Sequence, residues 1–210
     1  MARVDPLALR RRQLPHILPA MKREILIWPD PRLKLKSKRV TTFDATFQAL
    51  CDDLFETMYA AEGVGLAAAQ VGVHQRVLVI DTSPRQEGQT PLVFVNPEIT
   101  RAEGKAEYTE GCLSVPGEYE DTGVRAASIT CKALDRHGKP FEIHADGLLA
   151  IAIQHEMDHL EGVLFVDYLS SLKRGMIKKR MQRLIDERES EPEPAVEAPA
   201  RKKRAATARP

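Results

Sequence analysis

The chain has 210 residues, of which 43% are hydrophobic and 29% are charged, and its formal net charge is +1. This length allows one sizeable core, and so small a net charge argues against a chain whose bulk binds nucleic acid or an anionic membrane. The sequence contains no apolar run close to the roughly 18 residues that would span a bilayer.

The two ends of the chain differ in composition from its middle. Residues 1–20 hold three consecutive arginines and three prolines without the apolar core of a secretory signal, so we predict a flexible N-terminal extension. Residues 189–210 combine four prolines with charged residues and almost no large apolar side chain, which predicts a disordered charged tail. One folded domain is therefore expected over residues 21–188.

In the first half of this domain, short apolar runs surround one helix. Residues 24–28 predict a strand, which ends at the proline-containing turn 29–31. A helix is predicted from Thr42 or Asp44 to about Glu62, because six apolar side chains recur at helical spacing. That apolar stripe consists of Phe47, Leu50, Cys51, Leu54, Met58 and Tyr59. The following stretch G-V-G-L-A-A-A-Q, at 63–70, has two glycines and predicts a tight loop beside a bound peptide.

Runs rich in β-branched residues predict a series of further strands. They cover residues 76–81, 92–96, about 105–108, 127–134, 139–144 and 163–166. The turn D-R-H-G at 135–138 is expected to join two of them as a hairpin.

One stretch, Q-H-E-M-D-H-L-E-G at 154–162, carries the residues best suited to chemistry. His155 and His159 are four apart, so on a helix both imidazoles lie on one face, one turn apart. This spacing suits two nitrogen ligands of one divalent metal ion, with Glu156 beside them as a general base. The residues just before this stretch are almost all apolar, which predicts a buried helix and a dry metal site.

The C-terminal helix, predicted over about 171–188, is amphipathic. Its apolar stripe consists of Leu172, Met176, Ile177, Met181, Leu184 and Ile185, and we expect it to pack on the domain. Its opposite face carries Lys173, Arg174, Lys178, Lys179, Arg180 and Arg183. Strands and helices without a strict βαβ alternation predict an α+β fold, with antiparallel β-sheets packed around the central metal-binding helix and with N-terminal and C-terminal helices.

A catalytic metal site of this kind commonly has a third protein ligand. Our candidate is Cys112, within E-G-C-L-S-V-P at 110–116, because a nearby cation favours the thiolate that acts as a ligand. Cys51 and Cys131 are predicted to be small buried side chains. Three widely spaced cysteines do not form a disulfide framework, which favours a reducing compartment.

A metallopeptidase is the main alternative. In the extended pattern H-E-x-x-H-x-x-G-x-x-H, the third ligand position is occupied here by Phe165, which cannot bind a metal. A peptidase with a glutamate ligand would need Glu187 or Glu189, which lie at the edge of the predicted tail.

Three stretches, 63–70, 110–116 and 154–162, resemble in sequence and in order the three motifs of the peptide deformylase family. P-D-P-R-L at 29–33 is similar to the N-terminal segment of that family, and the resemblance covers about residues 21–185. Two positions depart from it: Ala69 stands where many members have proline, and Tyr119 where some have an arginine near the substrate.

The resemblance implies a hydrolase that removes the N-formyl group from the initiator methionine of nascent polypeptides and releases formate. Its implied metal ligands are Cys112, His155 and His159. The implied cofactor is Fe²⁺, one per chain, although a Cys-His-His ligand set also suits zinc. Metal-bound water would attack the formyl carbon with Glu156 as general base, while the Gln70 side chain and the Leu113 backbone N–H stabilise the oxyanion.

The resemblance also implies a substrate site and partners. The substrate-binding residues would be Val64, Gly65, Leu148, Ile151 and Ala152. The expected partners are formyl-Met nascent peptides and, through the basic helix at 171–188, the ribosome, but no membrane, and the expected location is a bacterial-type cytoplasm. A relative that only binds the ribosome and has no activity is a second alternative, against which the intact Cys112, Glu156 and histidines argue.

Overall fold

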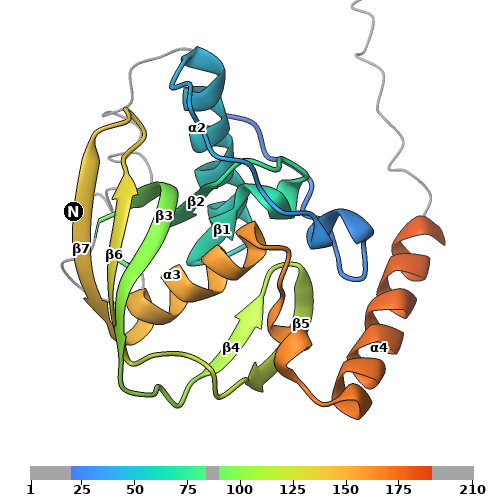
Figure 1. The fold of residues 1–210 in the computed structure, drawn as a ribbon. Helices are drawn as coiled ribbons and strands as arrows, with labels where there is room; N and C mark the ends of the chain where they lie inside the picture. Colours follow the sequence, from blue (N-terminus) through green and yellow to red (C-terminus); the bar gives the residue numbers. More distant parts are fainter. Residues whose placement is uncertain (1–19, 84–89, 191–210) are drawn as a thin grey trace, which may run out of the picture.

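The computed structural model describes residues 20–83 and 90–190, and Figure 1 shows how they fold. The larger sheet has five strands in the order β1-β2-β3-β6-β7, and all neighbouring strands run antiparallel. Its strands are β1 (Gly65–Ala67), β2 (Val77–Ile80), β3 (Leu92–Glu103), β6 (Ser128–Leu134) and β7 (Pro140–Asp146).

Two helices cover the two faces of this sheet (Figure 1). Helix α2 (Ala45–Ala60) and helix α3 (Gly147–Leu160) pack on opposite faces. One strand can contact both helices, because its successive side chains point to opposite faces of the sheet. In β2, Val77 and Val79 belong to the apolar cluster under α2. Leu78 and Ile80 of the same strand belong to the cluster under α3.

The smaller sheet is a hairpin of β4 (Thr109–Cys112) and β5 (Val115–Asp121). Near it lie the short 3-10 helix η4 (Phe165–Tyr168) and the long helix α4 (Ser171–Ser190), which stands at one side of the molecule (Figure 1). A third apolar cluster joins these elements to the N-terminal segment. It contains Leu26, Trp28, Leu33, Val115, Leu164, Phe165, Val166, Ile177 and Met181.

Antiparallel sheets with a buried central helix confirm the predicted α+β class. The helix predicted to end at about Glu62 is α2, and Asp44 caps it by accepting a hydrogen bond from the Phe47 N–H at 2.9 Å. The hairpin turn at 135–138 is also confirmed, since it joins β6 to β7. The predicted extension and tail lie outside the described residues, apart from Ala20 and the last two residues of α4, so the domain boundaries remain a prediction.

Three predicted strands are wrong. Residues 24–28 are extended but join no sheet, because Leu26 donates its N–H to the Gln70 carbonyl and Trp28 donates to Ser114, two separate segments. Residues 105–108 are irregular, and the strand begins only at Thr109. Residues 163–166 lead instead into η4, whose turn is closed by Asp167 accepting the Leu164 N–H at 2.9 Å.

Three strands, β1, β4 and β5, appear where we predicted none. Residues 110–116 form the end of β4 and the start of β5, and the expected loop at 63–70 contains β1 and the 3-10 helix η3 (Ala68–Val71). Both segments are too short to show a clear alternation of apolar and polar residues.

Helix α4 packs through fewer residues than its sequence predicted. Ile177 and Met181 are buried, whereas Leu172 and Met176 are largely exposed. Across residues 20–83 and 90–190, no helix is long and apolar enough to cross a membrane.

Gly162, just after α3, gives a test of how this helix is joined to the rest of the fold. Its φ is +74°, and a Cβ there would overlap the Lys34 backbone carbonyl. Gly162→Ala should therefore lower the free energy of unfolding by about 2 kcal/mol or more. The matched control is Gly175→Ala in α4, where a Cβ meets nothing within 4 Å and helix propensity predicts a gain of up to about 1 kcal/mol. Urea denaturation of both variants measures the difference, and equal stabilities would contradict this role of Gly162.

Candidate metal centre

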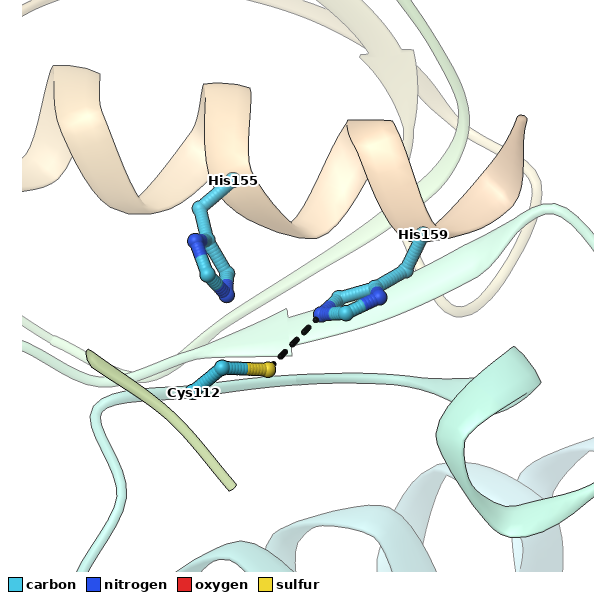
Figure 2. A group of neighbouring side chains, drawn as sticks. All are labelled: Cys112, His155 and His159. Atoms are coloured by element: carbon cyan, nitrogen blue, oxygen red, sulfur yellow. Dashed lines mark hydrogen bonds between the residues drawn. The ribbon is translucent and has the colours of Figure 1, made fainter. Parts of the chain in front are cut away.

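Helix α3 brings the two histidines of the H-E-x-x-H stretch to one point in the interior. Both side chains are buried, and their ring centroids lie 5.0 Å apart at an interplanar angle of 80°. They project from successive turns of the same helix face toward the end of β4 (Figure 2). The four-residue spacing therefore has the predicted consequence.

Cys112, the last residue of β4, faces these histidines from the smaller sheet (Figure 2). Its Sγ lies 3.2 Å from His159 Nε2, and one ligand atom from each of the three residues falls within 4.8 Å of the others. Two ligands of a single tetrahedral zinc-type ion are about 3.5 Å apart. The group is thus compact enough to hold one metal ion.

A buried ion-pair network fixes the orientation of His155. Its Nδ1 lies 2.6 Å from Glu110 Oε2, and because a carboxylate only accepts, Nδ1 is the donor. Glu110 also accepts from the Arg125 guanidinium at 2.7 and 3.0 Å and from the Thr122 hydroxyl at 2.6 Å. With Nδ1 engaged in this way, Nε2 is the His155 ring nitrogen left to face Cys112 and His159, the orientation that a metal-binding histidine requires.

The charges around the site favour a bound cation. Burial opposes ionisation of Glu110, but hydrogen bonds from His155 and Arg125 outweigh burial and lower the pKa of Glu110 to about 2. Burial also opposes a charge on His155, yet the Cys112 sulfur and Glu110 outweigh it and raise the pKa of His155 well above its usual value. The ionised Glu110 thus places a negative charge against the His155 ring, and this charge would also attract a metal ion bound there.

His159 is suited to the same ion. Burial, followed by the nearby His155, lowers the pKa of His159 well below its usual value, so its ring is neutral and can act as a ligand. Its Nδ1 is buried and has no hydrogen-bond partner among the described residues. One thiol and two imidazoles, of which at least one is held neutral, form a donor set that fits a divalent transition metal.

Glu156 lies beside this group and is buried against β1. A Cβ on Gly65 would come within 2.5 Å of Glu156 Oε1, so this carboxylate reaches its place only because residue 65 is glycine. Burial raises the pKa of Glu156 to about 7, although His155 opposes the shift. Its Oε2 has no partner within the described part of the chain. A carboxylate with a pKa near neutrality and one unpaired oxygen is suited to accept and release protons.

The two residues predicted to stabilise an oxyanion lie next to Cys112, Gln70 in space and Leu113 along the chain. Gln70, in η3, accepts the Ala67 N–H at 2.8 Å through Oε1. Its Nε2 therefore points toward Ser114 Oγ at 3.2 Å and Cys112 Sγ at 3.6 Å. Leu113 lies in the turn between β4 and β5, with its side chain against Gly63.

The predicted substrate-binding residues divide into three groups. Leu148 and Ile151 lie on the same face of α3 as His155, and both are outside the apolar clusters of the described core. Ala152 shares that face but is part of the cluster between α3 and the sheet. Val64 is half-buried just before β1, and Gly65 opens that strand, paired with Ile80.

Sequence reasoning assigned no role to Glu110, Arg125 or Asp158. Glu110 lies two residues before Cys112 in β4, but no strand was predicted there and the register shifts between Gly111 and Cys112, so spacing alone did not place it at the site. Arg125 comes from a loop before β6 and binds both Glu110 and Asp158, the latter at 2.6 Å. No spacing in the sequence predicts that contact.

Fold and site together define the class of the protein, an α+β protein whose buried central helix carries two histidines of a group able to hold a metal ion. Comparison with known proteins supports this class. The family model described as polypeptide deformylase matches residues 22–175. Peptide deformylase 2 of Xanthomonas axonopodis pv. citri is 58% identical over 160 residues, which cover 75% of this chain and 92% of that protein.

Solved structures agree with this result. In a crystal structure, a peptide deformylase from Legionella pneumophila has 50% sequence identity to this chain and a TM-score of 0.76. The match covers 82% of this chain and 100% of the Legionella chain. The Ehrlichia chaffeensis peptide deformylase, in complex with actinonin, has 41% sequence identity to this chain and a TM-score of 0.74. The match covers 78% of this chain and 97% of the Ehrlichia chain. The chain belongs to the peptide deformylase family. It is therefore an enzyme that removes the N-formyl group from nascent polypeptides.

Substituting each cysteine in turn tests the metal centre. Cys112→Ala should weaken the binding of a divalent cation more than about 100-fold, since it removes a predicted ligand. Cys51→Ala and Cys131→Ala should bind like the wild type, because burial raises the pKa of these thiols to about 12 and about 11 and keeps them protonated within the core. Bound metal per chain, measured after loading without oxygen, distinguishes the three variants. Equal loss in all three would contradict the assignment of Cys112.

Proposed function

We propose that deformylation by this enzyme depends on one divalent metal ion, Fe²⁺ in the active form, held by Cys112, His155 and His159. The proposal depends above all on one observation: this thiol and these two imidazoles meet next to a buried carboxylate, Glu156. Zn²⁺ is expected to substitute, because the same ligands suit zinc.

A metal ion bound there would lower the pKa of water and polarise the formyl carbonyl. Glu156 is the general base that takes a proton from the attacking water, and it then returns the proton to the leaving amine as the C–N bond breaks. Its pKa of about 7 suits both transfers near neutral pH. The products are formate and a free N-terminal methionine.

Two donors are proposed to stabilise the oxyanion, the charge that develops on the formyl oxygen as water adds to the formyl carbon. The Gln70 Nε2 already points toward Cys112, because its Oε1 is held by the Ala67 N–H. The Leu113 backbone N–H, in the turn after Cys112, is the second donor. Donors held in place before the reaction cost no reorganisation when the charge develops.

The peptide is proposed to add to the edge of the larger sheet. β1 pairs only with β2, and within the described residues no strand covers its other edge, so Gly65 can form backbone hydrogen bonds with an extended chain. The methionine side chain would then lie against Val64 and the face of α3 that carries Leu148, Ile151 and Ala152. Ala152 contributes less, because it already packs in the core.

We further propose that residues 21–188 form the catalytic unit. The enzyme would act in the bacterial cytoplasm, where formylated chains emerge from ribosomes.

The role of Glu156 is tested by formate release from formyl-Met-Ala-Ser with iron-loaded enzyme. Glu156→Ala should keep its metal, because Glu156 is not a ligand, while kcat falls about 100-fold or more. The matched control is Glu161→Ala, which removes a carboxylate five residues later whose ion pairs with Arg76 and Lys36 lie outside the metal centre. Binding of actinonin, which the Ehrlichia chaffeensis enzyme holds, shows whether each variant keeps its site. Near-full turnover by Glu156→Ala would contradict the proposed base.

Helix α4 is proposed to dock the enzyme on the ribosome. Of the six cations on its predicted basic face, two are already engaged with β5: Lys173 with Glu120 at 2.7 Å and Arg180 with Glu118 at 2.6 Å. The other four are exposed and form no ion pair among residues 20–83 and 90–190. These four are Arg174, Lys178, Lys179 and Arg183. RNA phosphates are the natural partners of such a surface.

Replacing these four cations by glutamine should reduce co-sedimentation with ribosomes and make its salt dependence less steep. Substitution is preferable to deleting α4, because deletion would expose Ile177 and Met181, which are buried against the domain. A control variant with the same loss of charge replaces Lys38, Arg39, Lys105 and Lys139. If both variants co-sediment equally, the helix is not the docking surface. Turnover of a short formyl-peptide should be unchanged in both.

A further inference from the structure

The short helix η4 contacts the surroundings of His155 at two points. Phe165, at its start, is fully buried, and its ring stacks on the His155 ring with centroids 6.5 Å apart and an interplanar angle of 27°. Tyr168, at its end, lies on the far side of the ion-pair network that holds His155. The segment after the metal-binding helix therefore returns to support that helix.

A continuous series of hydrogen bonds leads from Tyr168 to His155. The Tyr168 hydroxyl donates to Asp158 Oδ2 at 3.0 Å, and the same oxygen accepts from Arg125 Nη1 at 2.6 Å. Arg125 donates from its other nitrogens to Glu110 at 2.7 and 3.0 Å. Glu110 Oε2 finally accepts from His155 Nδ1 at 2.6 Å.

We propose that Tyr168 is a positioning residue of the metal centre. Through Asp158 it fixes the outer end of Arg125, and Arg125 in turn fixes the carboxylate that orients His155. The inference rests on the proposed metal site and adds to it a residue that touches neither metal nor substrate.

Burial explains why the outer end of Arg125 matters. Its side chain is only 5% exposed, whereas Tyr168 is 40% exposed and lies with its ring centroid 5.6 Å from the guanidinium carbon. The tyrosine ring therefore covers the guanidinium on its solvent side and adds a cation–π contact. Burial and Asp158 raise the pKa of Tyr168 to about 12, so its hydroxyl remains a donor.

Removing the Tyr168 hydroxyl should weaken metal binding only partly, because water can take over some of its hydrogen bonding. A cavity of about 280 Å³ borders Arg125, Asp158 and Tyr168 and gives solvent access to this end of the network. Loss of a residue that directly supports a metal ligand typically weakens metal binding 10- to 100-fold. Tyr168 lies further out, so we expect Tyr168→Phe to weaken it about 3- to 10-fold.

The test measures the affinity of the metal-free enzyme for Co²⁺ by competition with a chelator, together with the visible absorption of the Co²⁺ form. Tyr168→Phe keeps the ring and removes the hydroxyl. The matched control is Tyr59→Phe, since Tyr59 on α2 donates to Asp81 at 2.7 Å, outside the network that holds His155. Only Tyr168→Phe should weaken binding and change the absorption, and its kcat should fall with KM unchanged.

A double-mutant cycle tests the route through Asp158. Asp158→Asn alone should weaken Co²⁺ binding at least as much as Tyr168→Phe, and adding Tyr168→Phe to it should have little further effect, because both act on Arg125. Losses of Co²⁺ affinity that add in the double variant, or that are equal in the Tyr168 and Tyr59 variants, would overturn the positioning role. Tyr168 would then contribute only to general packing. Wild-type affinity in Tyr168→Phe would overturn it while the metal site stands. Absence of Co²⁺ binding by the wild type would remove the metal site itself.

Discussion

Glu110 is an ionised carboxylate whose side chain is only 3% exposed, and the rest of the site depends on how it is neutralised. An unpaired buried charge is strongly unfavourable, so Glu110 is stable only with Arg125 and His155 in place. These partners come from a loop before β6 and from α3, while Glu110 belongs to β4. One buried contact therefore ties the smaller sheet to the central helix and, two residues further along β4, holds Cys112 opposite the histidines.

The space around Glu156 depends equally on close packing. Its carboxylate fits only because residue 65 has no side chain, and the same absence leaves the backbone of an edge strand open to a peptide. The proposed general base and the proposed substrate strand thus meet at one glycine. The burial that excludes water from this point also raises the pKa of Glu156 to about 7. Exclusion of water therefore helps to give Glu156 the pKa that its proposed role as general base requires.

The elements that follow α3 have two separate roles. η4 faces inward, where Phe165 and Tyr168 support the surroundings of His155. α4 is joined to the domain by Ile177, Met181 and two ion pairs to β5, and most of its remaining surface is exposed. Such an arrangement lets a helix present cations to a partner without disturbing the metal centre, provided that its two buried side chains stay in place.

The sequence by itself determined the α+β class, helix α2 with Thr42 or Asp44 as its cap, the buried helix α3 and the two histidines on one face, because these follow from local periodicity and spacing. Through three ordered motifs it also determined the family. Only the tertiary structure decided that residues 24–28 and 163–166 are not strands. The first segment bonds to two distant segments of the chain and the second closes a local turn, and amino-acid composition encodes neither choice of partner. It alone decided the contacts of Glu110 with Arg125 and of Gly65 with Glu156, because each joins segments separated along the chain and depends on how the sheets and α3 pack.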